Sequence, residues 1–205
     1  AMTEIFTLGT FVVVHLVALA SPGPNLLIVS QTAVSRSRRA GMWVTAGIST
    51  GAATFSTLAL LSLDFLFGQI PWAYGALKLA GGGYLFYLGF RLWRSADTTI
   101  VPSQPDNSTH SNWRAYRLGL FTALTNPKAA LFFGSVMTAL FPPASPTWVK
   151  IAVIGLVIMD SFGFHAAIAC LFSLPGVQER YQQMRRWTDR LAGGALMILG
   201  IRLVR

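Results

Sequence analysis

Two charged side chains lie deep within apolar stretches of the sequence, where a charge needs a partner or a function. Asp160 stands ten residues after Lys150, and Lys128 directly follows a proline. A charge at the centre of a bilayer costs about 2.5 to 3.5 kcal/mol on insertion scales, so both side chains should face the protein interior. Intramembrane charges of this kind mark pathways for substrates, ions or protons.

Three interpretations of these charges are open, and they are not all exclusive. Asp160 and Lys128 can form a static ion pair. They can instead hold a substrate that carries both charges, such as a zwitterionic amino acid with its carboxylate near Lys128 and its ammonium near Asp160. Asp160 can also carry a coupling proton, as intramembrane carboxylates do in pumps and transporters.

Proline motifs interrupt two of the apolar runs that carry these polar groups. Ser21-Pro22-Gly23-Pro24-Asn25 interrupts the run 6–34, and Thr125-Asn126-Pro127-Lys128 interrupts the run 118–141. Proline removes a backbone donor and clashes with the preceding turn, so each run is predicted to be two half-helices joined by irregular backbone. Paired broken segments in the two halves of a chain point to a transporter's binding site.

The predicted substrate site gathers both motifs and the buried carboxylate. It comprises Ser21, Pro22, Gly23, Pro24, Asn25, Asn126, Pro127, Lys128 and Asp160, with Asp160 also as the proton-coupling residue. Asn25 and Asn126 either contact substrate or cap a half-helix and satisfy freed backbone. His15 and His165 are expected to be structural residues and not ligands. The glycines Gly47 and Gly51 are expected to let helices approach closely.

The composition is that of a membrane protein. Of the 205 residues, 53% are hydrophobic and 11% are charged, against about 25% charged in soluble proteins. Six apolar segments can be drawn, at about 5–34, 41–63, 72–93, 117–141, 148–174 and 188–204, each long enough to cross a bilayer in roughly 20 residues. We therefore predict an all-α membrane protein of six transmembrane helices, with the first and fourth broken.

The basic residues give this topology an orientation. Eleven of the sixteen Lys and Arg residues fall in three alternate connections: Arg36, Arg38, Arg39, Arg91, Arg94, Arg114, Arg117, Arg180, Arg185, Arg186 and Arg190. Because cytoplasmic loops carry an excess of Lys and Arg, both termini are predicted to lie outside. The net charge of +9 thus reflects topology and gives no reason to expect a nucleic-acid partner.

A repeated sequence relates the two halves of the chain. Residues 82–94 read GGYLFYLGFRLWR and residues 193–205 read GGALMILGIRLVR, identical at eight of thirteen positions. With three crossings in each half, the copies would cross in opposite directions, which is an inverted repeat. The predicted organisation is a first three-helix repeat at 1–94, a polar cytoplasmic linker at 95–113 and a second repeat at 114–205, together forming one membrane domain.

Several function classes find no support in the sequence. It contains no phosphate-binding loop for ATP and no HExxH zinc motif, so an ion gradient is the expected energy source, with no cofactor or bound metal and no enzymatic activity. Cys170 is the only cysteine, so a two-cysteine redox relay within one chain is impossible.

The motifs resemble those of the LysE/RhtB family of bacterial amino-acid exporters. The resemblance rests on Pro22-Gly23-Pro24-Asn25, on the basic loop from Arg36 to Gly41 with Gly47 and Gly51 beyond it, and on Asn126-Pro127-Lys128-Ala129 leading into Leu131-Phe132-Phe133. It spans nearly the whole chain. Two positions depart from the family pattern: Phe162 and Phe164 stand where a tryptophan is expected, and Phe141-Pro142-Pro143 replaces a Pro-Gln-Phe motif.

The resemblance implies a secondary exporter of an amino acid or close analogue in the bacterial inner membrane. It further implies proton antiport with alternating access, an acidic residue in the fifth segment that corresponds to Asp160, and an arrangement in which a homodimer is one option. The alternative is a cation or metal-ion exporter, because related superfamilies share the architecture. Three scattered histidines and one cysteine argue against a soft-metal site.

Overall fold

The computed structural model describes residues 2–21, 23–69, 111–142, 145–174 and 176–177, with side chains of the second range to residue 62, and isolated positions between 79 and 94 and between 187 and 201. The helices are α1 (Met2–Ala20), α2 (Pro24–Ser35), α3 (Arg38–Gln69), α5 (Asn112–Leu124), α6 (Pro127–Leu140) and α7 (Thr147–Phe172). No strand occurs in these described ranges, which confirms the all-α class.

Both proline motifs coincide with the beginning of a new helix. α1 ends at Ala20, and α2 begins with Pro24 after Gly23, whose backbone is extended (φ −174°, ψ 178°). α5 ends at Leu124, and α6 begins with Pro127. Proline is suited to the first helical position, where its missing N–H would have no helical partner and its φ is already set. The chain therefore leaves helical geometry just before each proline.

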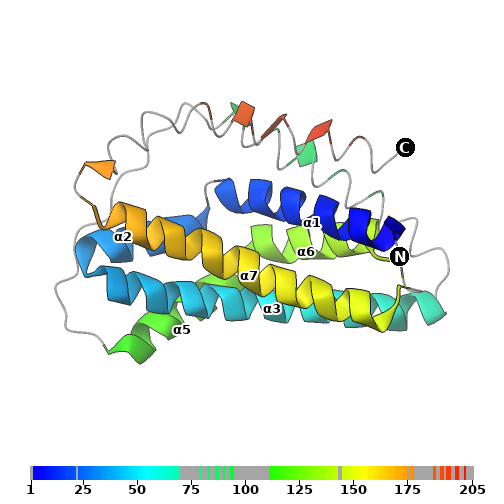
Figure 1. The fold of residues 1–205 in the computed structure, drawn as a ribbon, viewed down its shortest axis with the longest axis horizontal. Coiled ribbons are helices and arrows are strands. Elements are labelled where there is room, and N and C mark those ends of the chain that lie inside the picture. Colours follow the sequence, from blue (N-terminus) through cyan, green and yellow to red (C-terminus); the bar gives the residue numbers. More distant parts are fainter. Residues whose placement is uncertain are drawn as a thin grey trace.

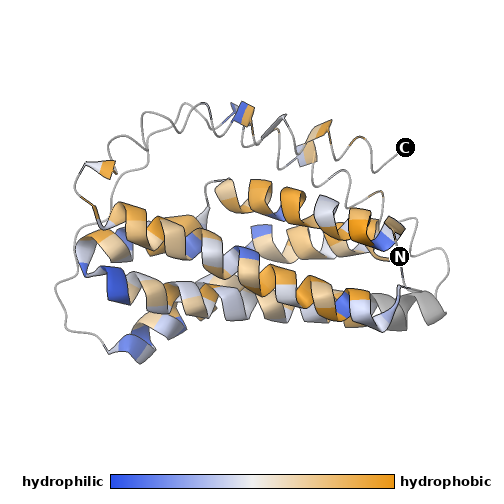
Figure 2. Ribbon diagram, viewed as in Figure 1, coloured by the Kyte–Doolittle hydropathy of each residue, from blue (hydrophilic) through white to orange (hydrophobic). Residues whose placement is uncertain are grey.

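The helices form a bundle whose long axes are roughly aligned (Figure 1). α1, α3, α6 and α7 lie along one another, while α2 and the beginning of α5 lie at the end of the bundle where α3 begins. α1 and α7 both begin at the opposite end. The basic residues before and within the first turns of α3 and α5 therefore share one end, where Figure 2 shows the strongest hydrophilic colouring.

α3 and α5 make the closest helix crossing in the described structure. A Cβ atom on Gly47 would collide with the Tyr116 carbonyl oxygen, one on Gly119 with the Val44 carbonyl oxygen, and one on Gly51 would come within 2.6 Å of the Ala123 Cβ. The order of these contacts means that the two helices run in the same direction. Glycine is needed here because the two backbones touch, which confirms the expectation for Gly47 and Gly51.

Three of the described helices are long and apolar enough to cross a membrane. They are Met2–Ala20, Arg38–Ser62 and Thr147–Phe172, and the shorter apolar helix Pro127–Leu140 accompanies them. Figure 2 shows apolar residues over most of the described length of these helices, and many of their large apolar side chains are exposed. Since a bilayer favours apolar outer faces, the bundle is built for a lipid environment.

Some sequence predictions fall outside the described residues. These are Pro22, most of the linker 95–113, and, apart from isolated positions, the apolar segments 72–93 and 188–204 with the repeated sequences. The count of six crossings and the inverted repeat therefore stay predictions.

Candidate functional site

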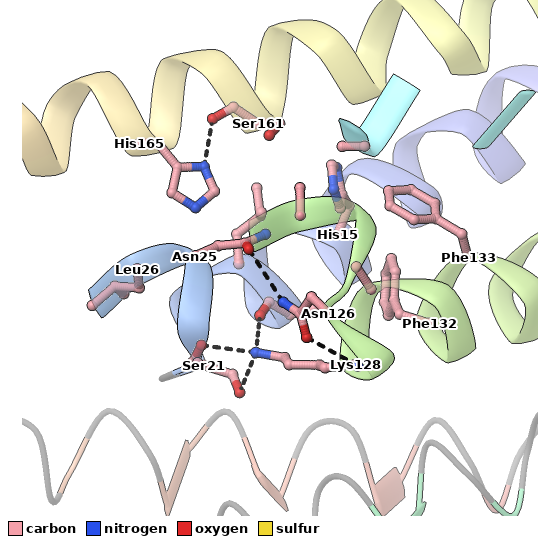
Figure 3. Close-up of a pocket in the computed structure, with 16 residues that line it drawn as sticks. His15, Ser21, Asn25, Leu26, Asn126, Lys128, Phe132, Phe133, Ser161 and His165 are labelled. Atoms are coloured by element: carbon pink, nitrogen blue, oxygen red, sulfur yellow. Dashed lines mark hydrogen bonds between the residues drawn. The ribbon is translucent and has the colours of Figure 1, made fainter. Parts of the chain in front are cut away.

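The two helix junctions meet at a cavity inside the bundle (Figure 3). Its lining comprises His15, Ala18, Leu19, Ser21, Gly23, Asn25, Leu26, Ala52, Ala123, Asn126, Lys128, Ala129, Phe132, Phe133, Ser161 and His165. The cavity has a volume of about 50 Å³. Because one water needs about 10 to 15 Å³ of such volume, the cavity suits a few waters or a small polar molecule.

Five residues of the predicted site line this cavity. They are Ser21, Gly23, Asn25, Asn126 and Lys128. Pro24, Pro127 and Asp160 are not in the lining, and Pro22 lies outside the described residues. Residues 21 and 128, separated by more than 100 positions, are therefore neighbours because the two proline motifs face each other.

The two asparagines connect the junctions. The Asn126 Nδ2 amide donates a hydrogen bond to Asn25 Oδ1 at 3.3 Å. The Asn126 Oδ1 atom also accepts the Lys128 backbone N–H at 3.0 Å, so this side chain caps α6. Asn126 thus does what an N-cap does while it also lines the cavity. Both interpretations of this residue are compatible with its position.

Lys128 reaches across from α6 to the end of α1. Its Nζ atom donates to the carbonyl oxygens of Ala18 at 3.0 Å and Ser21 at 2.8 Å, and to the Ser21 Oγ at 2.8 Å. An ammonium has three protons, and three acceptors surround this one. The carbonyls that end a helix carry partial negative charge, which favours a cation there. The positive charge therefore stabilises the buried carboxyl end of α1.

Asp160 pairs with a histidine. The His15 Nδ1 lies 3.3 Å from the Asp160 Oδ2, and the side chains are 2% and 13% exposed, respectively. The structure thus gives Asp160 and Lys128 different partners, in place of the static pair between them that was one interpretation of the sequence. His15 lies in the cavity lining and Asp160 does not, so His15 stands between Asp160 and the cavity.

Aromatic rings hold His15 in place. The His15 ring stacks on Phe11 at 5.4 Å and on Phe132 at 5.8 Å, and lies 5.6 Å from Phe133, measured between ring centroids. His15 was expected to be structural, but its ring faces both the cavity and a carboxylate. The sequence does contain one indication of a functional role for His15, because it is a titratable residue deep within an apolar segment.

The α7 side of the cavity carries a second histidine. The His165 Nδ1 lies 2.8 Å from the Ser161 carbonyl oxygen, one turn earlier in the same helix. The Ser161 Oγ accepts a hydrogen bond from the Ser49 Oγ of α3 at 3.5 Å. His165 is buried and satisfied locally, in keeping with the expected structural role, although it also lines the cavity. Within the described ranges, no three His, Cys, Asp or Glu side chains gather as a metal site would require.

Comparison with known proteins assigns the family. The family model described as "LysE type translocator" matches residues 16–205. The chain belongs to the LysE family. It is 34% identical over 197 residues to the threonine efflux protein of Escherichia coli (strain K12), which covers 95% of this chain and 96% of that protein.

Two other relatives show lower identity to the chain. It is 33% identical over 196 residues to an uncharacterized membrane protein of Haemophilus influenzae, covering 94% of the chain and 93% of the relative. It is 28% identical over 136 residues to the homoserine/homoserine lactone efflux protein of Salmonella typhimurium, covering 66% of the chain and 65% of that protein. No solved structure matches the chain. As a member of the LysE family, the protein is a membrane transporter and not an enzyme.

Proposed function

We propose that this protein exports a small neutral amino acid, or a close analogue, across the bacterial inner membrane in exchange for protons. The observation that carries the proposal is the cavity where the two proline motifs meet, because it joins polar groups, a cation and a histidine that is paired with a carboxylate, all inside an apolar bundle. The efflux of threonine and of homoserine named for the relatives supports an amino-acid substrate.

A zwitterion would find a cation at one side of this cavity and aromatic rings at the other. Its carboxylate would lie near the Lys128 ammonium and the beginning of α2, where Asn25 and Leu26 line the wall and the helix dipole favours an anion. Its ammonium would lie toward His15 and the faces of Phe132 and Phe133, which attract cations. The small cavity volume favours a short side chain over a long one.

The coupling proton would be exchanged at the pair formed by His15 and Asp160. In this scheme Asp160 stays behind the cavity wall and acts through His15, which contacts the interior. Among the described residues, the other titratable groups that line the cavity are Lys128, held by α1, and His165, held by its own helix. Proton relays of Asp and His side chains in membrane transporters follow this pattern.

Alternating access would use the two halves as an inverted repeat. α1 runs toward the end where α5 begins while α5 runs away from it, and α3 and α7 run in opposite directions, which supports such a relationship. The basic end of α3 and α5 would face the cytoplasm and both termini would lie outside, in line with the distribution of arginine. Rocking of one half against the other would expose the cavity to each side in turn.

The test is transport in proteoliposomes with a panel of labelled amino acids, including threonine and homoserine, with and without a proton gradient. Wild-type protein should accumulate one or a few of them only with the gradient. Asp160→Asn and His15→Gln should lose gradient-driven accumulation but keep exchange of labelled for unlabelled substrate.

A matched control replaces the carboxylate at the beginning of α1, far from the cavity. Glu4→Gln should transport like wild type. If Asp160→Asn retains full gradient-driven accumulation, the assignment of the proton site is wrong. If no amino acid is transported by wild-type protein, the substrate class is wrong.

A further inference from the structure

A second hollow lies on the outer surface of the bundle, between α3 and α7. It is an open groove of about 570 Å³ lined by Arg38, Arg39, Met42, Trp43, Ala46 and Phe162. We call it the basic groove. It contains none of the residues that line the cavity between the helix junctions, so what it binds is independent of the proposed function.

The residues of the basic groove form a continuous strip along the bundle. Positions 38, 39, 42, 43 and 46 recur at helical spacing, so they share one side of α3. Eight residues at about 1.5 Å each place Ala46 roughly 12 Å further into the bundle than Arg38. Phe162 lies at the inner end, because its neighbour Ser161 contacts Ser49 of α3.

The chemistry changes along this strip from charged to apolar. The guanidinium groups of Arg38 and Arg39 are exposed at the end of the helix, and no ion pair joins either one to a carboxylate within the described ranges. Further inward, Trp43 and Phe162 are each 39% exposed. Because α3 from Arg38 to Ser62 is a candidate membrane span, its outward apolar side chains would meet lipid.

We propose that the basic groove binds an anionic phospholipid. The phosphate would accept hydrogen bonds from the guanidinium groups, which match phosphate oxygens in a planar fork. The glycerol backbone and the upper part of an acyl chain would lie against Trp43 and Phe162, and tryptophan favours this interfacial depth. Basic pockets at the ends of membrane helices recognise anionic head groups in this way.

The test uses Trp43 as the reporter. In a variant that keeps only this tryptophan, with Phe at the other five positions, quenching by brominated phosphatidylglycerol is compared with quenching by brominated phosphatidylcholine in liposomes. The expected result is a preference for the anionic lipid, falling by about fivefold for each of Arg38→Gln and Arg39→Gln. A variant that keeps only Trp113, which is exposed at the same end of the bundle on α5, should show quenching that Arg38→Gln and Arg39→Gln leave unchanged.

Native mass spectrometry of the otherwise unchanged protein provides a measurement that does not depend on the tryptophan replacements. Bound phosphatidylglycerol should be lost in the double variant R38Q/R39Q and retained in R114Q/R117Q, which removes the same charge from α5 at the same end. Equal quenching of Trp43 by both lipids would overturn the proposal. So would a preference that survives R38Q/R39Q, displacement of the lipid by glycerol phosphate alone, or a Trp43 that both lipids fail to reach because a second copy covers it.

Discussion

The α3–α5 crossing and the junction between the proline motifs are both places where segments distant in sequence touch. The first is a contact between backbones, and the second is made of side-chain hydrogen bonds. At the crossing, Gly47 and Gly119 bring backbone against backbone and leave no room for a side chain. At the junction, the contacts are hydrogen bonds from Asn126 and Lys128 to groups at the end of α1 and the beginning of α2.

The difference indicates which part of the transporter is fixed and which can change. A close backbone crossing has one geometry, because any shift creates either a gap or a collision. Hydrogen bonds from long polar side chains can be broken and remade with substrate or water at modest cost. We therefore expect α3 and α5 to move as one body and the junction to rearrange during transport.

The largest effect should follow from a side chain placed in the crossing. Gly47→Leu should yield no folded protein, because even a Cβ would collide with the Tyr116 carbonyl oxygen. Gly47→Ala should lower the free energy of unfolding by about 1 to 3 kcal/mol, the usual cost of overpacking. Thermal unfolding in detergent, followed by size-exclusion chromatography, measures both.

Gly134→Ala is the matched control for this experiment. A Cβ at Gly134 of α6 would meet nothing within 4 Å, and alanine is favoured over glycine in a helix by about 0.5 to 1 kcal/mol. This variant should be as stable as wild type or slightly more stable. If Gly47→Ala behaves in the same way, the crossing is looser than described and the contrast between the two regions fails.

An effect smaller than that of Gly47→Leu is expected at Lys128, where the contact is polar. Lys128→Met should lower stability by about 1.5 to 3 kcal/mol and reduce transport, because it leaves the oxygens of Ala18 and Ser21 without their charged donor. Ser21→Ala removes one of the three acceptors and should shift stability in the same direction by less. Unfolding curves and the KM for substrate are measured together.

These two variants distinguish two roles of Lys128. In one, its ammonium holds α1 and α6 together; in the other, it binds the substrate directly. If the lysine serves only the substrate carboxylate, Lys128→Met will raise KM without loss of stability. Ser21→Ala will then lower KM, because the ammonium is released toward the cavity. Either result would place the junction's chemistry in ligand recognition and not in holding the two helices together.

How much of this arrangement the sequence predicts depends on the kind of contact. The positions of Pro24 and Pro127 predict where helices begin, because proline fits the first turn of a helix and disrupts its interior, and the glycine spacing of α3 predicts a close crossing. The all-α class and the family likewise follow from the residues and their motifs.

The partner of Asp160 is a different matter. Its pairing with His15 joins positions 145 residues apart, and it depends on the rotation of α1 against α7, which no local pattern sets. The partner of Lys128 could not be predicted either, because its long side chain can reach either Asp160 or the end of α1 from the same backbone position. Side-chain chemistry was visible in the sequence, whereas the direction of each side chain was not.

The smallest effect should come from the link between the two asparagines. Asn126→Ala should cost about 0.5 to 2 kcal/mol, since it removes the cap of α6. Asn25→Ala should cost less, about 0.6 kcal/mol, which is typical of a hydrogen bond between membrane helices. Because both variants remove the same 3.3 Å hydrogen bond, the double variant should cost less than the sum of the single ones.

The double-mutant cycle therefore measures the link itself, through unfolding of the four proteins in the same detergent. A coupling near 0.6 kcal/mol, set against a cost of several times that at Gly47, would mean that the junction is held weakly enough to open during transport. Strictly additive effects would mean that the two asparagines act separately, Asn126 as a cap and Asn25 toward the cavity. The ability of the junction to change shape would then have to come from Lys128 alone.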